Sequence, residues 1–232
     1  MNDTSTRPTN RRRARTRLMM VASALVAMAA AAMALPSTAE AATPICSNQT
    51  GTTDGQYYRM WSDGQGTACI TPNSGNSYST SWNDVGDFIA GVGWNPGSNH
   101  TISYDATLSA SGGTSMLSLY GWTTNPVVEY YVIEDYVGSP NYSGTNMGTV
   151  TSDGGTYTII KHQSVKQLPG STPFAQYLAI RNSPRSNGTI TFSNFINAWA
   201  SHGMNLGTMN FQILATEALG GGKGNSSVTI NG

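Results

Sequence analysis

The chain has 232 residues, a formal net charge of zero and only 10% charged residues. Six of its twelve basic residues lie before residue 42, so the remaining part is mildly acidic, with six basic and ten acidic residues. This balance argues against a nucleic-acid partner, and the low charge together with 9% aromatic residues argues against a disordered chain.

The first segment has the organisation of a secretion signal. A basic run over 11–17 precedes an apolar run over 18–35 and a short stretch of small residues. We therefore predict a signal peptide over 1–41 and a single domain over 42–232 that is secreted and, after cleavage, has no membrane attachment. A membrane anchor is the alternative, because 18 apolar residues approach the length of a span. The leader is typical of bacterial export, and it leaves the choice between general and twin-arginine export open.

Secretion would permit a disulfide. Cys46 and Cys69 are the only cysteines and can pair in one way, although two free buried thiols are the alternative. The three histidines are scattered and show no ligand spacing with these cysteines, so we expect no metal site.

From residue 57 onward, the sequence predicts antiparallel β-sheet. Runs rich in β-branched and aromatic residues are separated by turns rich in Gly, Asn, Ser and Pro, a pattern typical of a β-sandwich or jelly roll. No alternation of strands and helices is present, so a parallel sheet is not expected. The predicted strands are 57–61, 77–82, 87–94, 101–108, 115–122, 127–136, 156–161, 176–182, 189–192, 210–217 and 226–230.

One segment has helical spacing instead. In Ser193–His202, Phe195, Ile196 and Trp199 fall on one helical face. Ser193 could cap the start of this helix and Gly203 could close its end. We predict a helix of about ten residues packed on the outside of a sheet.

Two glutamates lie within apolar strands. Strict alternation places Glu129 on one face with Tyr131, in a strand that is apolar on both faces. Burying an unpaired carboxylate is costly, so Glu129 needs an ion-pair partner, a place at an exposed rim or a catalytic role. Glu217 comes late in a second apolar strand. Two such carboxyls suit glycoside hydrolysis, in which an acid/base and a nucleophile flank the bond.

Aromatic residues are also concentrated here, since all 21 lie beyond residue 56. Aromatic rings stack on sugar faces, although packing in the core explains any single ring equally well. A mildly acidic, aromatic-rich, secreted sheet protein favours a neutral polysaccharide as partner.

The motifs resemble those of the family-11 glycoside hydrolases, the small jelly-roll endo-1,4-β-xylanases. The matching stretches cover nearly all of 42–232, and the combination of PVVEYY with SHGMNLG and ATE is highly specific. The resemblance implies an all-β jelly roll of two twisted antiparallel sheets, one short helix and a concave cleft. It also implies a monomeric catalytic domain that binds xylan or xylo-oligosaccharides, cleaves them with retention of configuration and uses no cofactor.

The resemblance assigns roles to individual residues. Glu129 matches the nucleophile and Glu217 the general acid/base. Further residues match substrate-site positions, namely Trp61, Asp87, Tyr120, Tyr131, Gln176 and, in the thumb hairpin, Pro169. An aspartate at the position of Asp87 is similar to acid-acting members, because a contacting Asp–Glu pair shares a proton. We therefore expect activity to require Asp87 protonated or sharing its proton.

Some positions depart from the family pattern. The thumb stretch 164–173 is shorter and lacks the usual tip, and Ser164 replaces an arginine. Leu219 and Phe211 replace tyrosines. We expect these changes to weaken binding of the sugar, but they leave both glutamates in place. Two alternatives therefore stay open, a jelly roll that binds xylan without cleaving it and a β-1,4-glucanase of a related clan.

Overall fold

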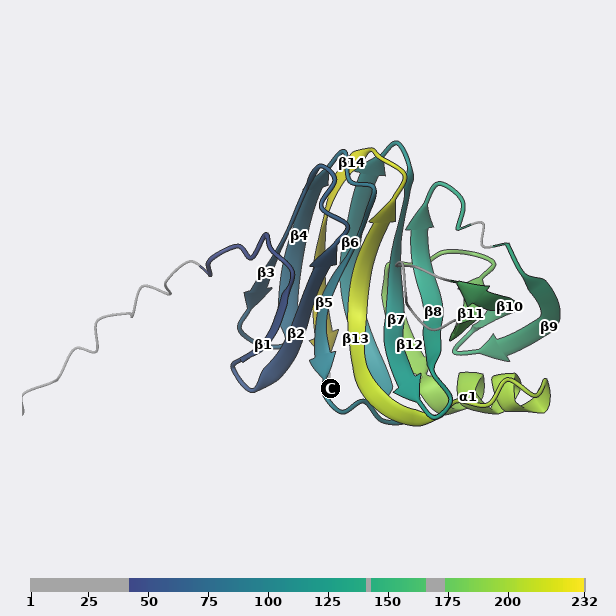
Figure 1. Ribbon diagram of the computed structural model, residues 1–232. Coiled ribbons are helices and arrows are strands. Elements are labelled where there is room, and N and C mark those ends of the chain that lie inside the picture. Colours follow the sequence, from purple (N-terminus) through teal and green to yellow (C-terminus); the bar gives the residue numbers. More distant parts are fainter. Residues whose placement is uncertain (1–41, 141–142, 166–173, 232) are drawn as a thin grey trace, which may run out of the picture. The chain divides into compact units, whose positions relative to one another are not determined.

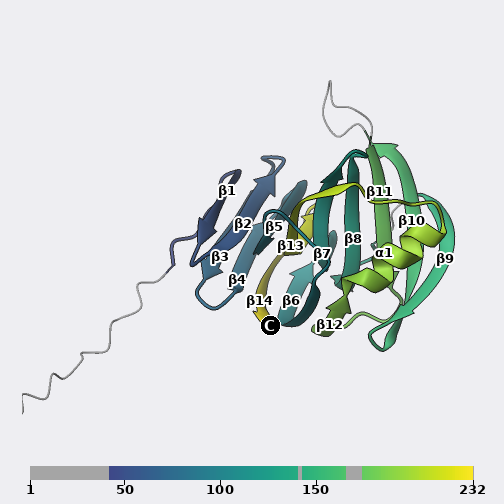
Figure 2. The same ribbon diagram turned by 90° about the horizontal axis from the view of Figure 1, so that it is seen from below.

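The computed structural model describes residues 42–140, 143–165 and 174–231, with side chains omitted at 163–165. The predicted signal peptide and Pro169 therefore lie outside the described residues. Within them, the chain forms two β-sheets and one helix, which confirms the predicted fold class. Figures 1 and 2 show the sheets as two layers, with β3, β4, β14, β6 and β12 in one of them.

The larger sheet contains most of the residues of interest. Its nine strands, in spatial order, are β1 (Gln49–Thr53), β2 (Gln56–Ser62), β5 (Asp87–Trp94), β13 (Thr208–Leu219), β7 (Thr114–Thr124), β8 (Val128–Val137), β11 (Phe174–Arg181), β10 (Gly155–Val165) and β9 (Thr145–Ser152). The five strands of the smaller sheet are β12 (Asn187–Thr191), β6 (Thr101–Ser111), β14 (Lys223–Asn231), β4 (Ser77–Asn83) and β3 (Thr67–Asn73).

The strand pairing is antiparallel with one exception. β11 runs parallel to β8, with Gln176 opposite Glu129. The chain leaves β8 to form the β9–β10 hairpin at the edge and then returns, so that β11 inserts between β8 and β10. This parallel pair was not predicted, because the intervening segment consists of strands rather than the helix that usually connects parallel strands.

Three strands of the structure were not predicted from the sequence, and all three are edge strands. β1 and β9 form the two edges of the larger sheet, and β3 forms one edge of the smaller sheet. β1 and β9 are rich in Thr, Asn and Gly and are largely exposed, while β3 contains a proline. Edge strands are commonly polar, short or interrupted in this way. β1 and β9 lack apolar alternation, and in β3 the alternation of Ala68 and Ile70 is short and ends at Pro72.

The main core lies between the sheets. Alternation turns Val128, Tyr130 and Val132 of β8 toward this core, where they join Tyr78 from β4 and Tyr104 from β6. The opposite face of the larger sheet carries a second apolar cluster, which includes Tyr120, Tyr131, Phe211 and Ile213. The larger sheet is therefore apolar on both faces, as the sequence of β8 indicates.

The helix α1 (Phe192–Ser201) packs on the part of the larger sheet that contains β8, β11 and β10 (Figure 2). Its buried rings contact sheet tyrosines: Phe192 stacks on Tyr130 and Phe195 meets Tyr157 edge-on. Gly203 closes the helix, because Gly203 N–H donates to the Ala200 carbonyl and Met204 N–H to the Trp199 carbonyl.

Ser193 does not cap this helix. The cap position is Thr191, whose N–H and hydroxyl both donate to the Asp153 carboxylate. The helix therefore begins one residue earlier than predicted, because a carboxylate distant in sequence binds the start of the helix from outside.

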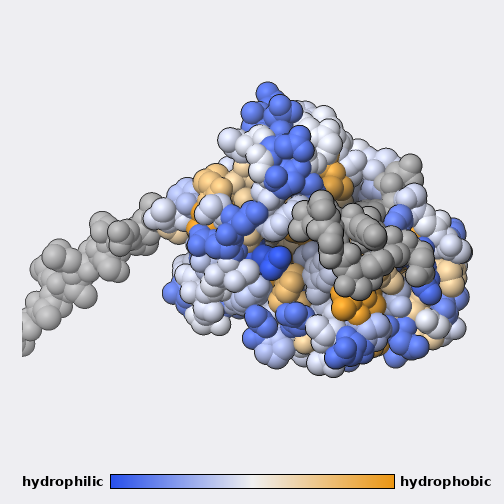
Figure 3. All heavy atoms as spheres, in the orientation of Figure 1, coloured by the Kyte–Doolittle hydropathy of each residue, from blue (hydrophilic) through white to orange (hydrophobic). Residues whose placement is uncertain are grey.

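Cys46 and Cys69 are joined in a disulfide. The face shown in Figure 3 is largely hydrophilic, with apolar residues in separate small patches. Among the described residues, Val127 is the one large hydrophobic side chain that is exposed, and no helix has the length and hydropathy needed to cross a membrane.

Candidate active site

The second apolar cluster forms one face of the larger sheet, and the polar candidates are grouped on that face. Residues directly opposite each other on neighbouring strands share a face of a sheet. Trp122 of β7 and Gln176 of β11 both lie opposite Glu129 of β8, and Tyr120 lies opposite Tyr131. On the other side, Trp61 of β2 and Glu217 of β13 both lie opposite Ile89 of β5. Strands distant in sequence thus bring the predicted residues together.

These residues line one cavity of about 190 Å³. Six of the predicted site residues border it, namely Trp61, Asp87, Tyr120, Glu129, Tyr131 and Glu217. Gln176 does not border the cavity but contacts Glu129 from the side. Pro169 lies outside the described residues, as does the side chain of Ser164.

Glu129 is buried and held by three hydrogen bonds. Tyr120 Oη donates to Oε1 at 2.7 Å and Tyr131 Oη donates to the same oxygen at 3.2 Å. Gln176 Nε2 donates to Oε2 at 2.5 Å. Trp122 Nε1 in turn donates to Tyr120 Oη, so the tyrosine hydroxyl is free to point its own hydrogen at Glu129. The carboxylate is thereby fixed in one orientation.

The pKa of Glu129 is raised, because burial outweighs the opposing effects of the hydrogen bonds from Gln176, Tyr120 and Tyr131 and of the charge of Arg59. All three hydrogen-bond donors favour the ionised form, because they have hydrogens to give to the carboxylate. The surroundings of Glu129 therefore suit a carboxylate that has to be negative within an apolar site.

Glu217 has different surroundings. Its side chain is buried, and no described residue hydrogen-bonds to its Oε2. Burial, together with the nearby charges of Asp87 and Glu129, raises the pKa of Glu217 well above its usual value. Glu217 is therefore the carboxyl of the pair that keeps its proton.

Asp87 lies beside Glu217, since Leu219, two residues beyond Glu217 on the same face, is opposite Asp87. Burial and the charges of Asp63 and Glu129 raise the pKa of Asp87 to about 7. Asp87 Oδ1 also lacks a hydrogen-bond partner among the described residues. Two buried carboxyls without other donors are expected to share protons rather than both ionise.

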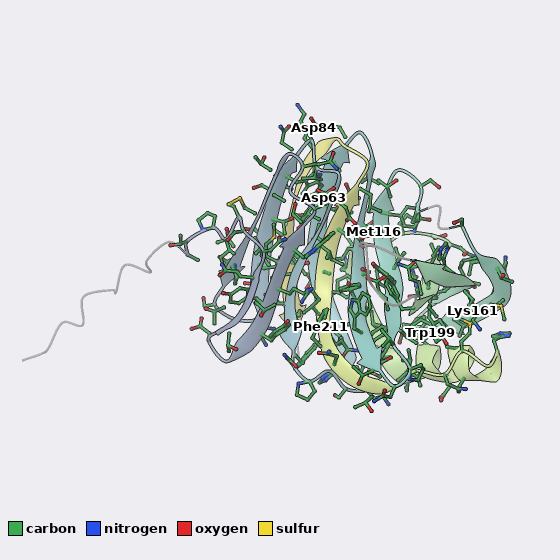
Figure 4. All side chains as sticks on the ribbon, viewed as in Figure 1. Asp63, Asp84, Met116, Lys161, Trp199 and Phe211 are labelled. Atoms are coloured by element: carbon green, nitrogen blue, oxygen red, sulfur yellow. A yellow bond between two sulfur atoms is a disulfide. The ribbon has the colours of Figure 1, made fainter. Side chains whose placement is uncertain are left out.

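The cavity also contains Arg59, Trp122 and Ile89, which the sequence analysis did not select. Alternation offered a signal for two of them. Arg59 shares a strand face with Trp61, and Trp122 shares one with Tyr120. The two substituted positions are close by: Phe211 contacts the ring of Tyr120, and Leu219 packs against the second apolar cluster. Figure 4 labels Phe211 on β13.

The comparisons with known proteins agree with this geometry. Residues 53–229 match the family model described as Glycosyl hydrolases family 11. The chain belongs to this family. It is 46% identical over 178 residues to the endo-1,4-beta-xylanase B of Penicillium oxalicum, covering 75% of this chain and 57% of that protein. It is 43% identical over 201 residues to the ethylene-inducing xylanase of Penicillium digitatum, covering 85% of this chain and 92% of that protein.

A solved structure from a comparison of two major endo-1,4-β-xylanases from Trichoderma reesei superposes with a TM-score of 0.68. It is 40% identical in sequence, and the match covers 81% of this chain and 98% of that one. The chain is thus a glycoside hydrolase of family 11 with the fold of a xylanase.

The same comparisons correct one expectation. The curated relatives that they name are fungal, which contradicts the bacterial origin inferred from the leader. A basic stretch, an apolar run and small residues are the general requirements of a secretory signal. The leader therefore carries no reliable information about the kind of organism.

Proposed function

We propose that this protein is a secreted endo-acting xylanase that cleaves internal β-1,4-xylosidic bonds of xylan and retains the configuration of the anomeric carbon. The observation that carries the proposal is the pair of buried glutamates in one cavity. Glu129 accepts three hydrogen bonds that favour its ionised form, and Glu217 is in surroundings that favour its protonated form.

This division of charge fits the two roles of a double displacement. In the first step, Glu217 gives its proton to the oxygen of the leaving sugar. Glu129 attacks the anomeric carbon, and a covalent glycosyl-enzyme forms as the glycosidic bond breaks. The hydrogen bonds that fix the Glu129 carboxylate hold it ready for this attack.

In the second step, Glu217 has lost its proton and acts as a base. It takes a proton from water, and the resulting hydroxide oxygen displaces Glu129 from the anomeric carbon. Both proton transfers use Glu217, and the covalent bond uses Glu129. No metal or other cofactor takes part in these steps.

Two further features support a xylan substrate. The similar proteins from Penicillium oxalicum and Penicillium digitatum are named as xylanases. The cavity is bordered by aromatic rings, including the half-buried Trp61, which can stack on a sugar face. We infer a monomer that acts on xylan outside the cell after the leader has been removed.

The release of reducing ends from linear xylan tests the proposal. We expect Glu129→Gln and Glu217→Gln each to lower kcat by roughly 10³-fold or more, with the double variant little worse than either one, because the residues act as a unit. Asp105→Asn is the control, since Asp105 is exposed on β6 of the other sheet. Anomeric configuration followed by NMR should show β-product first.

Other outcomes would select the alternatives. A wild-type protein that binds xylan but releases no reducing ends would be a binding protein. Faster cleavage of carboxymethyl cellulose than of xylan would identify a β-1,4-glucanase. An α-product formed first would contradict the retaining mechanism.

A further inference from the structure

Arg59 is a cation in the cavity, and its charge favours the ionised form of Glu129. It is the only cation among the described residues that line this cavity. It extends from the same face of β2 as Trp61, two residues away, and therefore stands next to the aromatic ring expected to contact the sugar. In the mechanism proposed above, Arg59 forms no bond to the sugar and transfers no proton.

The neighbouring strands leave room for this side chain. Arg59 lies opposite Gly91 of β5, and Gly91 lies opposite Ala215 of β13. A Cβ at position 91 would lie 2.1 Å from the Leu214 carbonyl oxygen, so only glycine permits this approach of β5 to β13. With no side chain at 91 and a methyl group at 215, the arginine reaches across β5.

The guanidinium group ends over a ring. Arg59 Cζ lies 4.7 Å from the centroid of the Phe211 ring. Such a contact is attractive and holds the planar guanidinium in a defined orientation. Because Phe211 has no hydroxyl, it cannot accept a hydrogen bond from the guanidinium. The contact therefore positions the cation without using its N–H groups.

The hydrogen-bonding groups of Arg59 have no partner among the described residues. No ion pair or hydrogen bond joins its guanidinium to another described residue, and its Nε is buried without a partner. Two other arginines differ clearly. Arg181 donates to two carbonyls and Tyr157, and Arg185 pairs with Glu134 and donates to two carbonyls. In the described part of the chain, Arg181 and Arg185 are thus paired, whereas the N–H groups of Arg59 have no described partner.

The shape of the group indicates the kind of ligand. A fixed planar guanidinium with unpaired N–H groups binds a carboxylate better than it binds a single hydroxyl. The other two acids of the cavity repel an added negative charge less than two ionised carboxylates would. The pKa values of Asp87 and Glu217 are both raised, which favours their neutral forms. The ionised Glu129 is already held by three donors.

We propose that Arg59 is a specificity-determining residue that binds the carboxylate of a uronic acid branch on xylan. The inference rests on the proposed function and adds a substrate class to it, namely acidic xylan. Binding would place the uronic acid branch on the β2 side of the cavity, where the xylan backbone passes Trp61.

Selectivity between two substrates tests this inference. The ratio of kcat/KM on a uronic-acid-substituted xylo-oligosaccharide to kcat/KM on the linear oligosaccharide of equal length is measured at low salt. We expect Arg59→Gln to lower this ratio about tenfold or more, since a hydrogen-bonded charge pair is lost. Arg59→Lys should give an intermediate ratio, because it keeps the charge but loses the fork. Lys223→Gln, which removes an exposed cation of the other sheet, should not change the ratio.

Two results would overturn the inference. One is an unchanged ratio in Arg59→Gln, including the case of equal losses on both substrates, which would show that Arg59 acts on the unbranched part of the substrate or on Glu129. The other is a wild-type preference for the acidic substrate that added NaCl does not weaken. The dissociation constants of the same two oligosaccharides for Glu129→Gln, with and without Arg59→Gln, give the ratio independently of turnover. Failure of the wild type to cleave linear xylan would instead contradict the proposed function, and the binding ratio would still decide the role of Arg59.

Discussion

At the scale of single residues, the site is organised by how each carboxyl is surrounded. Glu129 accepts hydrogen bonds from three side chains, whereas Asp87 and Glu217 each have a buried oxygen that forms no hydrogen bond with a described residue. Burial raises the pKa of all three carboxyls, but only Glu129 has hydrogen-bond donors that oppose this rise. Two pH-dependent predictions follow from this difference.

Asp87→Asn should move the alkaline limb of the pH–rate profile to higher pH. The pKa of Asp87 is raised to about 7 by burial and by the charges of Asp63 and Glu129. As pH rises through this value Asp87 ionises, and an ionised Asp87 competes with the glycosidic oxygen for the proton of Glu217. An asparagine cannot ionise, so the limb is then set by Glu217 alone. A profile of kcat/KM on linear xylan that stays in place or moves to lower pH would show that Asp87 has no such role.

Gln176→Leu should move the acid limb of the same profile to higher pH. Glu129 must be ionised to attack, burial already raises its pKa, and the hydrogen bond from Gln176 opposes that rise. Loss of the bond raises the pKa of Glu129 further, so activity begins at a higher pH. We expect kcat to fall by roughly 10- to 100-fold near the lower limb, as for a lost hydrogen bond to a charged group. An acid limb that does not move, with only KM affected, would limit Gln176 to binding sugar.

At the scale of elements, the two ends of helix α1 are specified in different ways. Gly203 closes α1 with a φ of 68° and two backbone hydrogen bonds, which local sequence alone specifies. The start of the helix depends instead on Asp153, which follows β9 and is far away in sequence. Local motifs thus predicted the end of the helix correctly and its start incorrectly.

Gly203→Ala should destabilise the protein by about 1 kcal/mol, because a Cβ disfavours the left-handed conformation. No atom lies within 4 Å of the added methyl group, so the cost comes from the backbone alone. Ser193→Ala is the control and should change the free energy of unfolding by less than about 0.5 kcal/mol, since no side-chain hydrogen bond caps α1. Urea unfolding measures both. A larger loss in Ser193→Ala than in Gly203→Ala would contradict this account.

At the scale of the whole molecule, a buried ion pair connects the two sheets. Glu134 of β8 accepts hydrogen bonds from Tyr104 of β6 in the smaller sheet and from Tyr157 of β10. Arg185 Nε contacts the same carboxylate at 2.6 Å. Glu134 is thus contacted by two tyrosine hydroxyls and by a guanidinium, which can only donate.

Glu134→Gln should therefore lower the free energy of unfolding by about 3 kcal/mol, near the lower end for breaking a buried ion pair. The lower end is appropriate because the Arg185 side chain keeps 20% of its exposure. Asp135→Asn is a neighbouring control, since Asp135 Oδ1 accepts only the N–H of Tyr136. Thermal and urea unfolding of both variants at neutral pH measure the difference. Equal losses of unfolding free energy in the two variants would show that the contacts of Glu134 stabilise the fold no more than the contact of Asp135 does.

The sequence by itself determined the strands with a buried face, the single helix, the closing role of Gly203 and the two glutamates. These features depend on alternation, on helical spacing and on local motifs, which require only neighbouring residues. The resemblance to a family then assigned roles that no single residue pattern could give.

Only the tertiary structure decided which side chains share a cavity and how burial and neighbouring groups shift the pKa values of its carboxyls. The edge strands β1 and β9 have no clear apolar pattern because they are largely exposed, and the short alternation of β3 is interrupted by a proline. Arg59 became visible as a site residue only because Gly91 and Ala215 let it reach Phe211 across β5. Contacts of this kind join strands that are far apart in the chain, and they depend on sheet order and register, which local sequence does not specify.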